Sequence, residues 1–235
     1  MMSKEETLDG NYKWVVVALL WLVALLNYLD RQMISTMRPS MQVDIEELQS
    51  ATNFGYLLAI FLWVYGLCSP LAGLVSDKFN RKRLIVGSLF VWSSVTFASS
   101  FNQLYILRAL MGISEAIYIP ASMALIADFH RGKTRSLANG IHLTGFYIGQ
   151  ALGGFGATVA QAFSWQHAFL CFGLLGIVYS FVLVLFLKEN PNRTFGISAL
   201  EQSKTPAFFE ALPKLFSKMA FVVILFYFAL PGIPI

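Results

Sequence analysis

Six long apolar runs constrain this 235-residue chain more than any other feature of its sequence. A helix needs about 20 mostly apolar residues to cross a bilayer, and no water is present there to satisfy exposed backbone groups. Turn residues and charges separate the runs. They predict membrane-spanning helices over residues 14–35, 51–73, 84–100, 104–128, 139–162 and 165–187. The expected fold class is therefore an all-α membrane protein.

The composition independently disfavours a water-soluble protein. Hydrophobic residues make up 57% of the chain and charged residues 13%, whereas an ordinary soluble domain is about 25% charged. Cys68 and Cys171 are expected near opposite ends of their helices, which is too far apart for a disulfide. A polar connector is expected over residues 188–217, after an amino terminus of residues 1–13 and the bundle of residues 14–187. Residues 218–235 begin a seventh apolar run.

The positive charges predict the orientation. Of the 17 Lys and Arg residues, 15 lie outside the spans, and 14 of these fall in the amino terminus, two loops and the connector, all of which share one side of the predicted topology. Only Arg38 is expected on the other side. The positive-inside rule then places the amino terminus in the cytoplasm, in a multi-pass protein of the cytoplasmic membrane. This topology explains the net charge of +4 without a nucleic-acid partner.

Four ionisable residues interrupt the predicted spans, namely Asp30, Arg31, Arg108 and Glu115. Each is costly to insert, so such residues mark ion and substrate pathways. Asp30 and Arg108 are expected at matching depths near the outer ends of their helices, where they could pair. Glu115 is expected two helical turns deeper, where burial disfavours its charged form, as a reversible proton carrier requires. The alternative is an ion pair that only stabilises the bundle.

Two short loops carry clusters of charged residues. The stretch Gly73-Leu74-Val75-Ser76-Asp77-Lys78-Phe79-Asn80-Arg81-Lys82-Arg83 resembles the signature loop of the major facilitator superfamily, with Asn80 in place of a second glycine. Asn80 is expected to allow a left-handed backbone at that turn. The segment from Asp128 to Arg135 is similar to the equivalent loop after the fourth helix. The resemblance implies a conformational gating role for Gly73, Asp77, Lys78, Arg81, Lys82, Asp128 and Arg135.

Two further segments narrow the resemblance. Asn27-Tyr28-Leu29-Asp30-Arg31 and the segment from Arg108 to Ala116 are similar to motifs of the anion:cation symporter and spinster-like branches of the superfamily. The symporter branch implies that Asp30 and Glu115 carry protons, while Arg31 and Arg108 attract an anionic small-molecule substrate. The spinster-like branch implies a lipid instead. The proton gradient is the expected energy source, with sodium coupling as the alternative that the sequence leaves open, and no cofactor is expected.

The predicted fifth helix combines packing residues with possible cavity residues. Gly145, Gly149, Gly153 and Gly156 form a stripe that permits close helix approach. The antiporter signature has proline where this chain has Gln150, so symport is favoured. Possible substrate contacts are Asn27, Asn53, Tyr56, Tyr147 and Gln150. His142 is expected to be structural.

The resemblance also implies an incomplete transporter. Members of the superfamily have two six-helix bundles with the substrate between them, whereas this chain predicts one bundle and the start of a seventh helix. The expected partner is therefore a carboxy-terminal half, besides the lipid bilayer. The sequence shows no metal-ligand cluster or nucleophile triad, so an enzyme is not expected. A membrane scaffold or receptor fragment is the non-transport alternative.

Overall fold

The computed structural model describes residues 4–98, 104–130, 132–189, 213, 216–220 and 222–223. The chain divides into two compact units, Met1–Arg193 and Thr194–Ile235. The first unit contains every element discussed below. Most of the predicted connector and of the seventh apolar run lies outside the described residues.

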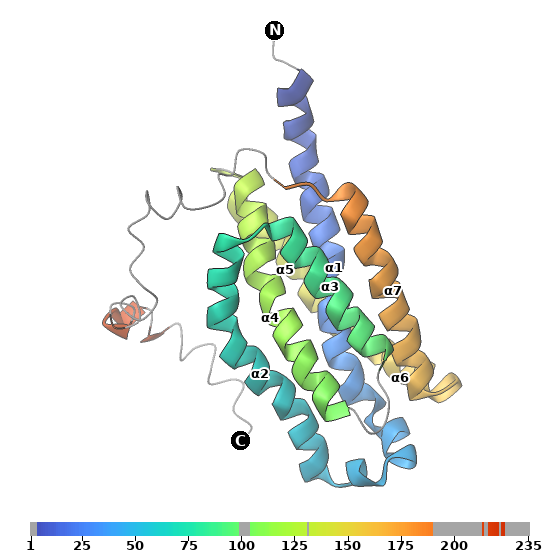
Figure 1. Cartoon of the computed structure of the whole chain (residues 1–235). Coiled ribbons are helices and arrows are strands. Elements are labelled where there is room, and N and C mark those ends of the chain that lie inside the picture. The colour runs from blue at the N-terminus through green and yellow to red at the C-terminus, as the bar shows by residue number, and fades with distance from the viewer. Residues whose placement is uncertain are drawn as a thin grey trace. The chain divides into compact units, whose positions relative to one another are not determined.

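The first unit is a bundle of helices that run up and down in alternation (Figure 1). Its elements are α1 (Lys4–Asp44), the short 3-10 helix η1 (Glu46–Gln49), α2 (Ala51–Lys78), α3 (Arg81–Phe97), α4 (Leu104–Phe129), α5 (Arg135–Leu152), α6 (Gly154–Ala162) and α7 (Trp165–Phe186). Helix α1 packs along α5 and α6, α2 packs along α4, and α3 packs between α4 and α7. The described part of the chain is thus all-helical, as the apolar runs predicted.

Four of the described helices are long and apolar enough to cross a membrane: residues Asn11–Asp44 of α1, together with α2, α4 and α7. Helix α3, with 17 residues, and the helices α5 and α6 do not meet the same criterion of length and hydropathy. Large apolar side chains are exposed along the outer faces, for example Leu67 on α2 and Leu185 on α7. A face of this kind is suited to contact with lipid.

Helix α1 is longer than predicted, and this changes where its charged residues lie along the helix. It continues without a break through Arg38 and Pro39 to Asp44. The Arg38 guanidinium lies 4.9 Å from the centre of the Phe54 ring, so its positive charge is accommodated against an aromatic face. Asp30 and Arg31 therefore lie about 20 Å before the end of the helix at about 1.5 Å per residue. The expectation that they lie near the outer end of the helix is wrong.

The helix predicted over residues 139–162 is divided into α5 and α6 at Gly153. The backbone N–H of Gly153 donates to the Gln150 carbonyl at 3.2 Å, which tightens the turn. The Gly153 carbonyl accepts a hydrogen bond from the Thr36 hydroxyl of α1 at 2.9 Å. A contact with α1 thus stabilises the point where α5 ends.

The glycine stripe allows α1 to approach α5 and α6 closely. A Cβ atom at Gly145 would lie 2.6 Å from the Trp21 carbonyl oxygen, and one at Gly149 would overlap the Leu25 carbonyl group. The same is true of Gly156, where a Cβ atom would lie 2.7 Å from Cγ of Met33. These close contacts support the interpretation of the stripe as packing residues rather than ligand contacts.

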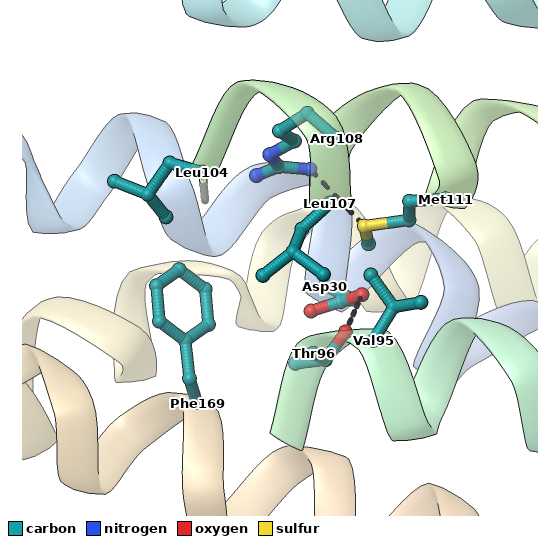
Figure 2. A pocket seen from close by; sticks show the side chains of 8 residues that line it. All are labelled: Asp30, Val95, Thr96, Leu104, Leu107, Arg108, Met111 and Phe169. Carbon is teal, nitrogen blue, oxygen red and sulfur yellow. Dashed lines mark hydrogen bonds between the residues drawn. The ribbon is translucent and has the colours of Figure 1, made fainter. Parts of the chain in front are cut away.

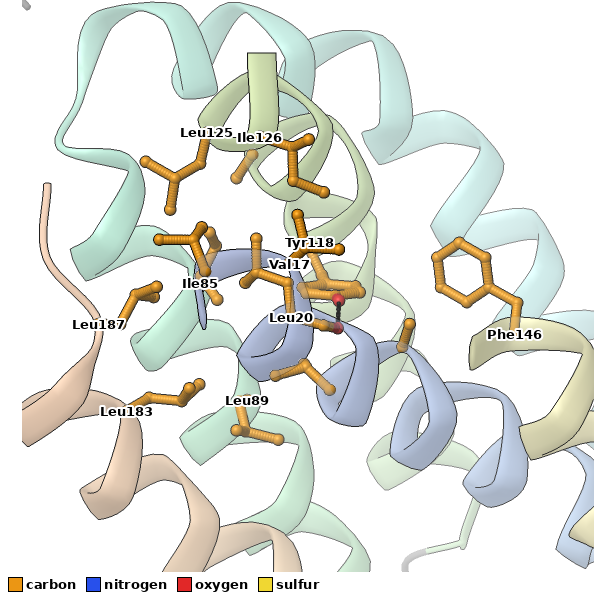
Figure 3. Packing of buried hydrophobic residues seen from close by; sticks show 14 of the residues in the cluster. Val17, Leu20, Ile85, Leu89, Tyr118, Leu125, Ile126, Phe146, Leu183 and Leu187 are labelled. Carbon is orange, nitrogen blue, oxygen red and sulfur yellow. Dashed lines mark hydrogen bonds between the residues drawn. The ribbon is translucent and has the colours of Figure 1, made fainter. Parts of the chain in front are cut away.

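Buried side chains fill the bundle in two layers. Figure 3 shows the layer nearer the amino terminus of α1, where Val17 and Leu20 meet residues of α3, α4 and α7. The Tyr118 hydroxyl donates to the Leu20 carbonyl at 2.7 Å and lies 2.9 Å from Nε2 of His142. His142 is fully buried in this arrangement, which is consistent with a structural role. The second layer surrounds the methionines Met33, Met37 and Met41 of α1.

In the turn between α2 and α3, the backbone conformation of Asn80 differs from the expected left-handed one. Its φ is −65° and its ψ is 116°, so the backbone is extended rather than left-handed. Its side-chain oxygen accepts a hydrogen bond from the Arg83 backbone N–H at 2.9 Å. Asparagine is favoured at this position because it caps the first turn of α3.

We expect Gly149→Ala to destabilise the protein by about 1–3 kcal/mol, the usual cost of forcing extra atoms into a packed interface. The matched control is Gly140→Ala on the same helix, where a Cβ atom would meet nothing within 4 Å. Thermal unfolding of the purified protein in detergent provides the measurement. Equal midpoints for the two variants would show that α1 and α5 are not held at this distance.

Candidate functional site

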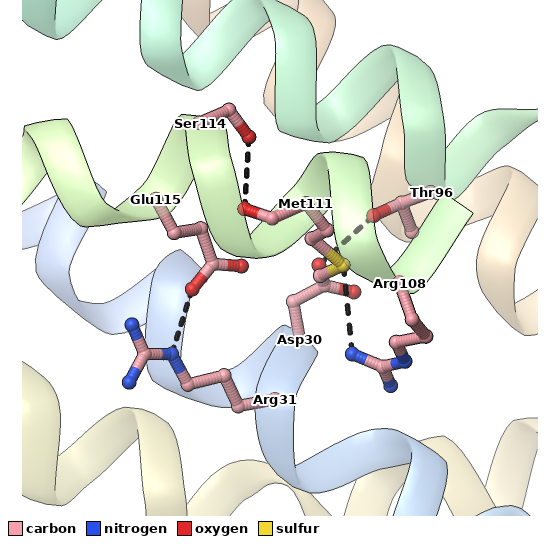
Figure 4. Close-up of polar contacts among 7 residues, drawn as sticks. All are labelled: Asp30, Arg31, Thr96, Arg108, Met111, Ser114 and Glu115. Carbon is pink, nitrogen blue, oxygen red and sulfur yellow. Dashed lines mark hydrogen bonds and ion pairs between the residues drawn. The ribbon is translucent and has the colours of Figure 1, made fainter. Parts of the chain in front are cut away.

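Helices α1 and α4 bring the four charged residues of the predicted spans into one buried cluster (Figure 4). Asp30 and Arg31 lie on α1, and Arg108 and Glu115 lie on α4. Asp30, Arg108 and Glu115 are buried, whereas 17% of the Arg31 side chain remains exposed. Arg31 is therefore the member of the cluster that a ligand reaches most directly.

The ion pair in this cluster joins Arg31 to Glu115. Nε of Arg31 lies 2.6 Å from Oε2 of Glu115. The pairing of Asp30 with Arg108, which the sequence suggested, is not the one this structure makes. Adjacent residues on a helix point about 100° apart. Because of this difference in direction, Asp30 and Arg31 reach different partners although they are neighbours in sequence.

Three aromatic rings surround the Arg31 guanidinium. Its central carbon lies 5.0 Å from the ring centre of Tyr28, 4.9 Å from that of Phe61 and 4.5 Å from that of Tyr65. A desolvated guanidinium over aromatic faces is stabilised by cation–π attraction. The rings from α2 approach because Gly112 of α4 lies against the α2 backbone, where a Cβ atom would be 2.8 Å from the Phe61 carbonyl oxygen.

Asp30 and Arg108 lie close to each other without a direct ion pair among the described residues. Oδ2 of Asp30 accepts a hydrogen bond from the Thr96 hydroxyl of α3 at 2.9 Å, while Nη1 of Arg108 donates to the Met111 sulfur at 3.5 Å. Figure 2 shows both residues at the wall of a cavity of about 10 Å³. Such a space is close to the minimum that holds one water molecule.

Several buried polar atoms of the cluster have no hydrogen-bond partner among the described residues. They are both amide atoms of Asn27, Oδ1 of Asp30, Nη2 of Arg31, Nη2 of Arg108 and Oε1 of Glu115. Buried polar groups are nearly always satisfied by protein, water or ligand. A cluster with this many free donors and acceptors is suited to exchanging partners, as proton and anion binding require.

Of the other predicted substrate contacts, Asn27 alone belongs to this cluster. It is fully buried one helical turn before Arg31 and lies next to the Glu115 carboxyl. Tyr56 and Tyr147 are exposed, with 55% and 72% of their surface accessible, and Gln150 is also exposed. Asn53 lies in the first turn of α2, where its side-chain amide donates to the Glu47 carbonyl of η1.

A second charge cluster joins the ends of α2, α3 and α4. Arg81 pairs with Asp128, donates to the Ala124 carbonyl at 2.8 Å and lies 3.7 Å from Asp77. The structure thus brings together three of the residues to which the resemblance assigned gating. Lys82 instead contacts α7 and the segment after it, through Val184 and Glu189.

The remaining members of the predicted gating set lie at the surface. Lys78 and Arg135 are exposed, and Gly73 faces open space on α2, where a Cβ atom would meet nothing within 4 Å. These residues are accessible to a partner. Within the residues that the structure describes, no group of His, Cys, Asp and Glu has the arrangement of a metal site.

Sequence reasoning missed three contributors to the buried cluster, Phe61, Tyr65 and Thr96. Phe61 and Tyr65 are four residues apart on α2 and share one helix face, which is a weak signal in an apolar run. Thr96 is a polar residue within a predicted span, and this was the available clue. Its partner on α1 could be identified only from the packing of the helices.

Comparisons with known proteins agree on a family. The family model described as Major Facilitator Superfamily matches residues 20–234. Among curated proteins, the chain is 29% identical to a hexuronate transporter of Bacillus subtilis, over 77% of this chain and 44% of that protein. It is 30% identical to a sphingosine-1-phosphate transporter of Xenopus tropicalis, over 79% of this chain and 38% of that protein. The chain thus spans less than half the length of these relatives.

A solved structure shares the fold. It is a bacterial homologue of the human lysosomal transporter spinster in an inward-facing, unoccupied conformation, with a TM-score of 0.70 and 24% sequence identity. The similarity covers 88% of this chain and 50% of that one. At this identity, the comparison is informative about the fold alone.

Proposed function

Because the chain belongs to the major facilitator superfamily, we propose that it is the amino-terminal half of a secondary transporter that moves an organic anion, such as a sugar acid, together with protons. The observation that carries this proposal is the buried pair between Arg31 and Glu115. One partner is a cation suited to a carboxylate, and the other is a carboxyl able to take a proton. The hexuronate transporter among the relatives supports a sugar acid as the substrate class.

Coupling follows from competition for Arg31. A guanidinium binds a carboxylate through two parallel hydrogen bonds, whereas Glu115 occupies only its Nε in this structure. A substrate carboxylate that takes over Arg31 leaves Glu115 fully buried without its counter-ion. An unpaired buried carboxylate is strongly unfavourable. Glu115 then binds a proton, so the substrate and the proton enter the protein together.

Asp30 and Arg108 provide a second proton-binding element beside the first. Arg108 approaches Asp30 without pairing to it, and its positive charge favours an anion in this region of the bundle. Asn27 lies next to the Glu115 carboxyl, where its side-chain amide is placed to bind a substrate hydroxyl. The proton gradient is the energy source, with no cofactor.

The membrane arrangement belongs to the same proposal. Six spans form one half, and a second half completes the substrate cavity. The charged ends that carry Lys13, Arg81, Lys133 and Lys188 face the cytoplasm, and the host membrane is the cytoplasmic membrane. The cluster of Asp77, Arg81 and Asp128 opens and closes against the second half during alternating access.

A lipid carrier is the second candidate. The sphingosine-1-phosphate transporter among the relatives favours it, as does the aromatic surround of Arg31. A phosphate headgroup would bind Arg31 while its chain lies against exposed apolar side chains. A membrane scaffold or receptor fragment would show neither transport nor proton coupling.

The coupling role of Glu115 is testable in the complete transporter, reconstituted in vesicles. We expect Glu115→Gln to abolish accumulation of D-glucuronate driven by a pH gradient, because the amide cannot take a proton. Exchange of labelled for unlabelled D-glucuronate should continue, since exchange requires no net proton release. Glu47→Gln, which changes an exposed carboxyl on η1, is the matched control. Unchanged accumulation in Glu115→Gln would remove this residue from coupling.

The substrate class is testable through the geometry of Arg31. We expect Arg31→Lys to weaken D-glucuronate binding by roughly 1.5–3 kcal/mol, the scale of a hydrogen bond to a charged group, because an ammonium cannot form the paired contacts. Arg38→Lys, on the same helix outside the cluster, should have no such effect. Binding of a lysophospholipid is measured in parallel. If the wild-type protein binds only the lipid, the second candidate is correct and the sugar-acid proposal is wrong.

A further inference from the structure

Thr96 connects α3 to the buried carboxyl of Asp30. Its side chain is only 3% exposed, at the wall of the small cavity that Asp30 and Arg108 also line (Figure 2). Its hydroxyl oxygen lies 2.9 Å from Oδ2 of Asp30 and 3.0 Å from the Trp92 carbonyl oxygen. Among the described residues, Thr96 makes the one hydrogen bond to Asp30, whose other oxygen has no partner.

The two contacts of Thr96 compete for one hydrogen atom. A hydroxyl carries a single hydrogen, whereas a carboxylate and a backbone carbonyl only accept. While Asp30 is charged, the Thr96 hydrogen is best placed on Asp30, because a hydrogen bond to an ionised group is the stronger one. Once Asp30 is protonated, its own hydrogen can go to the Thr96 oxygen. The Thr96 hydrogen is then free for the Trp92 carbonyl one turn earlier in α3.

We propose that Thr96 is a positioning residue that registers the protonation state of Asp30, with its hydroxyl hydrogen directed to Asp30 in the charged state and to Trp92 in the protonated state. This inference rests on the proposed proton-coupled function and extends it to α3. Hydrogen bonds from threonine to its own helix alter local helix geometry. The switch therefore links a proton on α1 to the conformation of α3.

The charged groups nearest to Asp30 lie on α4 and α1. Arg108 and Glu115 face it from α4, and Arg31 acts on it from α1. The α7 residues around it, Phe169, Phe172 and Gly176, carry no charge. Among the α3 residues that line the cavities beside Asp30, Thr96 is the one whose hydroxyl donates to Asp30, and removing that hydroxyl changes no charge.

Infrared spectroscopy of the purified complete transporter tests this proposal without any substrate. The carbonyl stretch of protonated Asp30 is the band that disappears in Asp30→Asn. In Thr96→Val, which removes the hydroxyl but keeps the shape, we expect this band to rise in frequency. We also expect its titration midpoint to move upward by about 0.5–1 pH unit, because the charged form loses the stronger hydrogen bond.

Two conservative variants and one control make the result specific. Thr96→Ser keeps the hydroxyl and should match the wild type, and Thr96→Cys, with a weaker donor, should lie between Ser and Val. Ser94→Ala on α3 removes a hydroxyl that, within the described part of the chain, donates to the Phe90 carbonyl of its own helix, and it should leave the band unchanged.

The proposal is overturned if Thr96→Val titrates like the wild type, or if Thr96→Ser behaves like Thr96→Val. The wild-type protein could bind protons at Asp30 as expected, with the predicted shifts in the Thr96 variants, and yet transport no anion. That result would count against the proposed function and not against the role of Thr96. If Thr96→Val does not fold, the comparison of Thr96→Cys with Thr96→Ser decides the question, and equal midpoints for these two variants overturn the proposal.

Discussion

The buried ion pair between Arg31 and Glu115 is the interaction on which this account depends. Removing two charges from water is costly, and a pair recovers that cost only with good geometry. Nε and Oε2 are 2.6 Å apart here, with aromatic rings around the guanidinium. Removing one partner would leave a buried charge uncompensated. The pair thus keeps α1 and α4 in register at rest and makes the carboxyl sensitive to any anion that competes for Arg31.

Close packing of the helices creates the conditions for that pair. Glycines on α5 let α1 approach at backbone distance, and Gly112 on α4 does the same for α2. As a result, residues from α1, α2, α3 and α4 converge on one polar region within an apolar bundle. Packing on all sides leaves Arg31 as the partly exposed cation, and it leaves small spaces beside Asp30 rather than an open channel.

Much of the fold was predictable because it follows from physical rules that act locally. Apolar length identified α2, α4 and α7 with nearly correct bounds, and small residues identified the packed face of α5. The end of α1 was not predictable from charge alone. Arg38 appeared to end the span, whereas Phe54 from α2 provides an aromatic face for it. The division at Gly153 likewise depends on Thr36, which is distant in sequence.

For the candidate site, the sequence identified the charged residues but not their partners. Asp30, Arg31, Arg108 and Glu115 stood out because charges are rare in apolar runs. Matching them by depth paired Asp30 with Arg108. The direction in which each side chain leaves its helix instead pairs Arg31 with Glu115. The roles of these residues in coupling remain a proposal that transport measurements must test.

The most direct test measures proton uptake when an anion binds. D-Glucuronate is added to the purified complete transporter in a weakly buffered solution near neutral pH, and a pH indicator follows the bulk solution. Competition for Arg31 predicts that binding withdraws protons from solution in the wild type. It also predicts that Glu115→Gln binds the anion with this uptake reduced or lost. Anion binding to the wild type with no proton uptake would contradict the account.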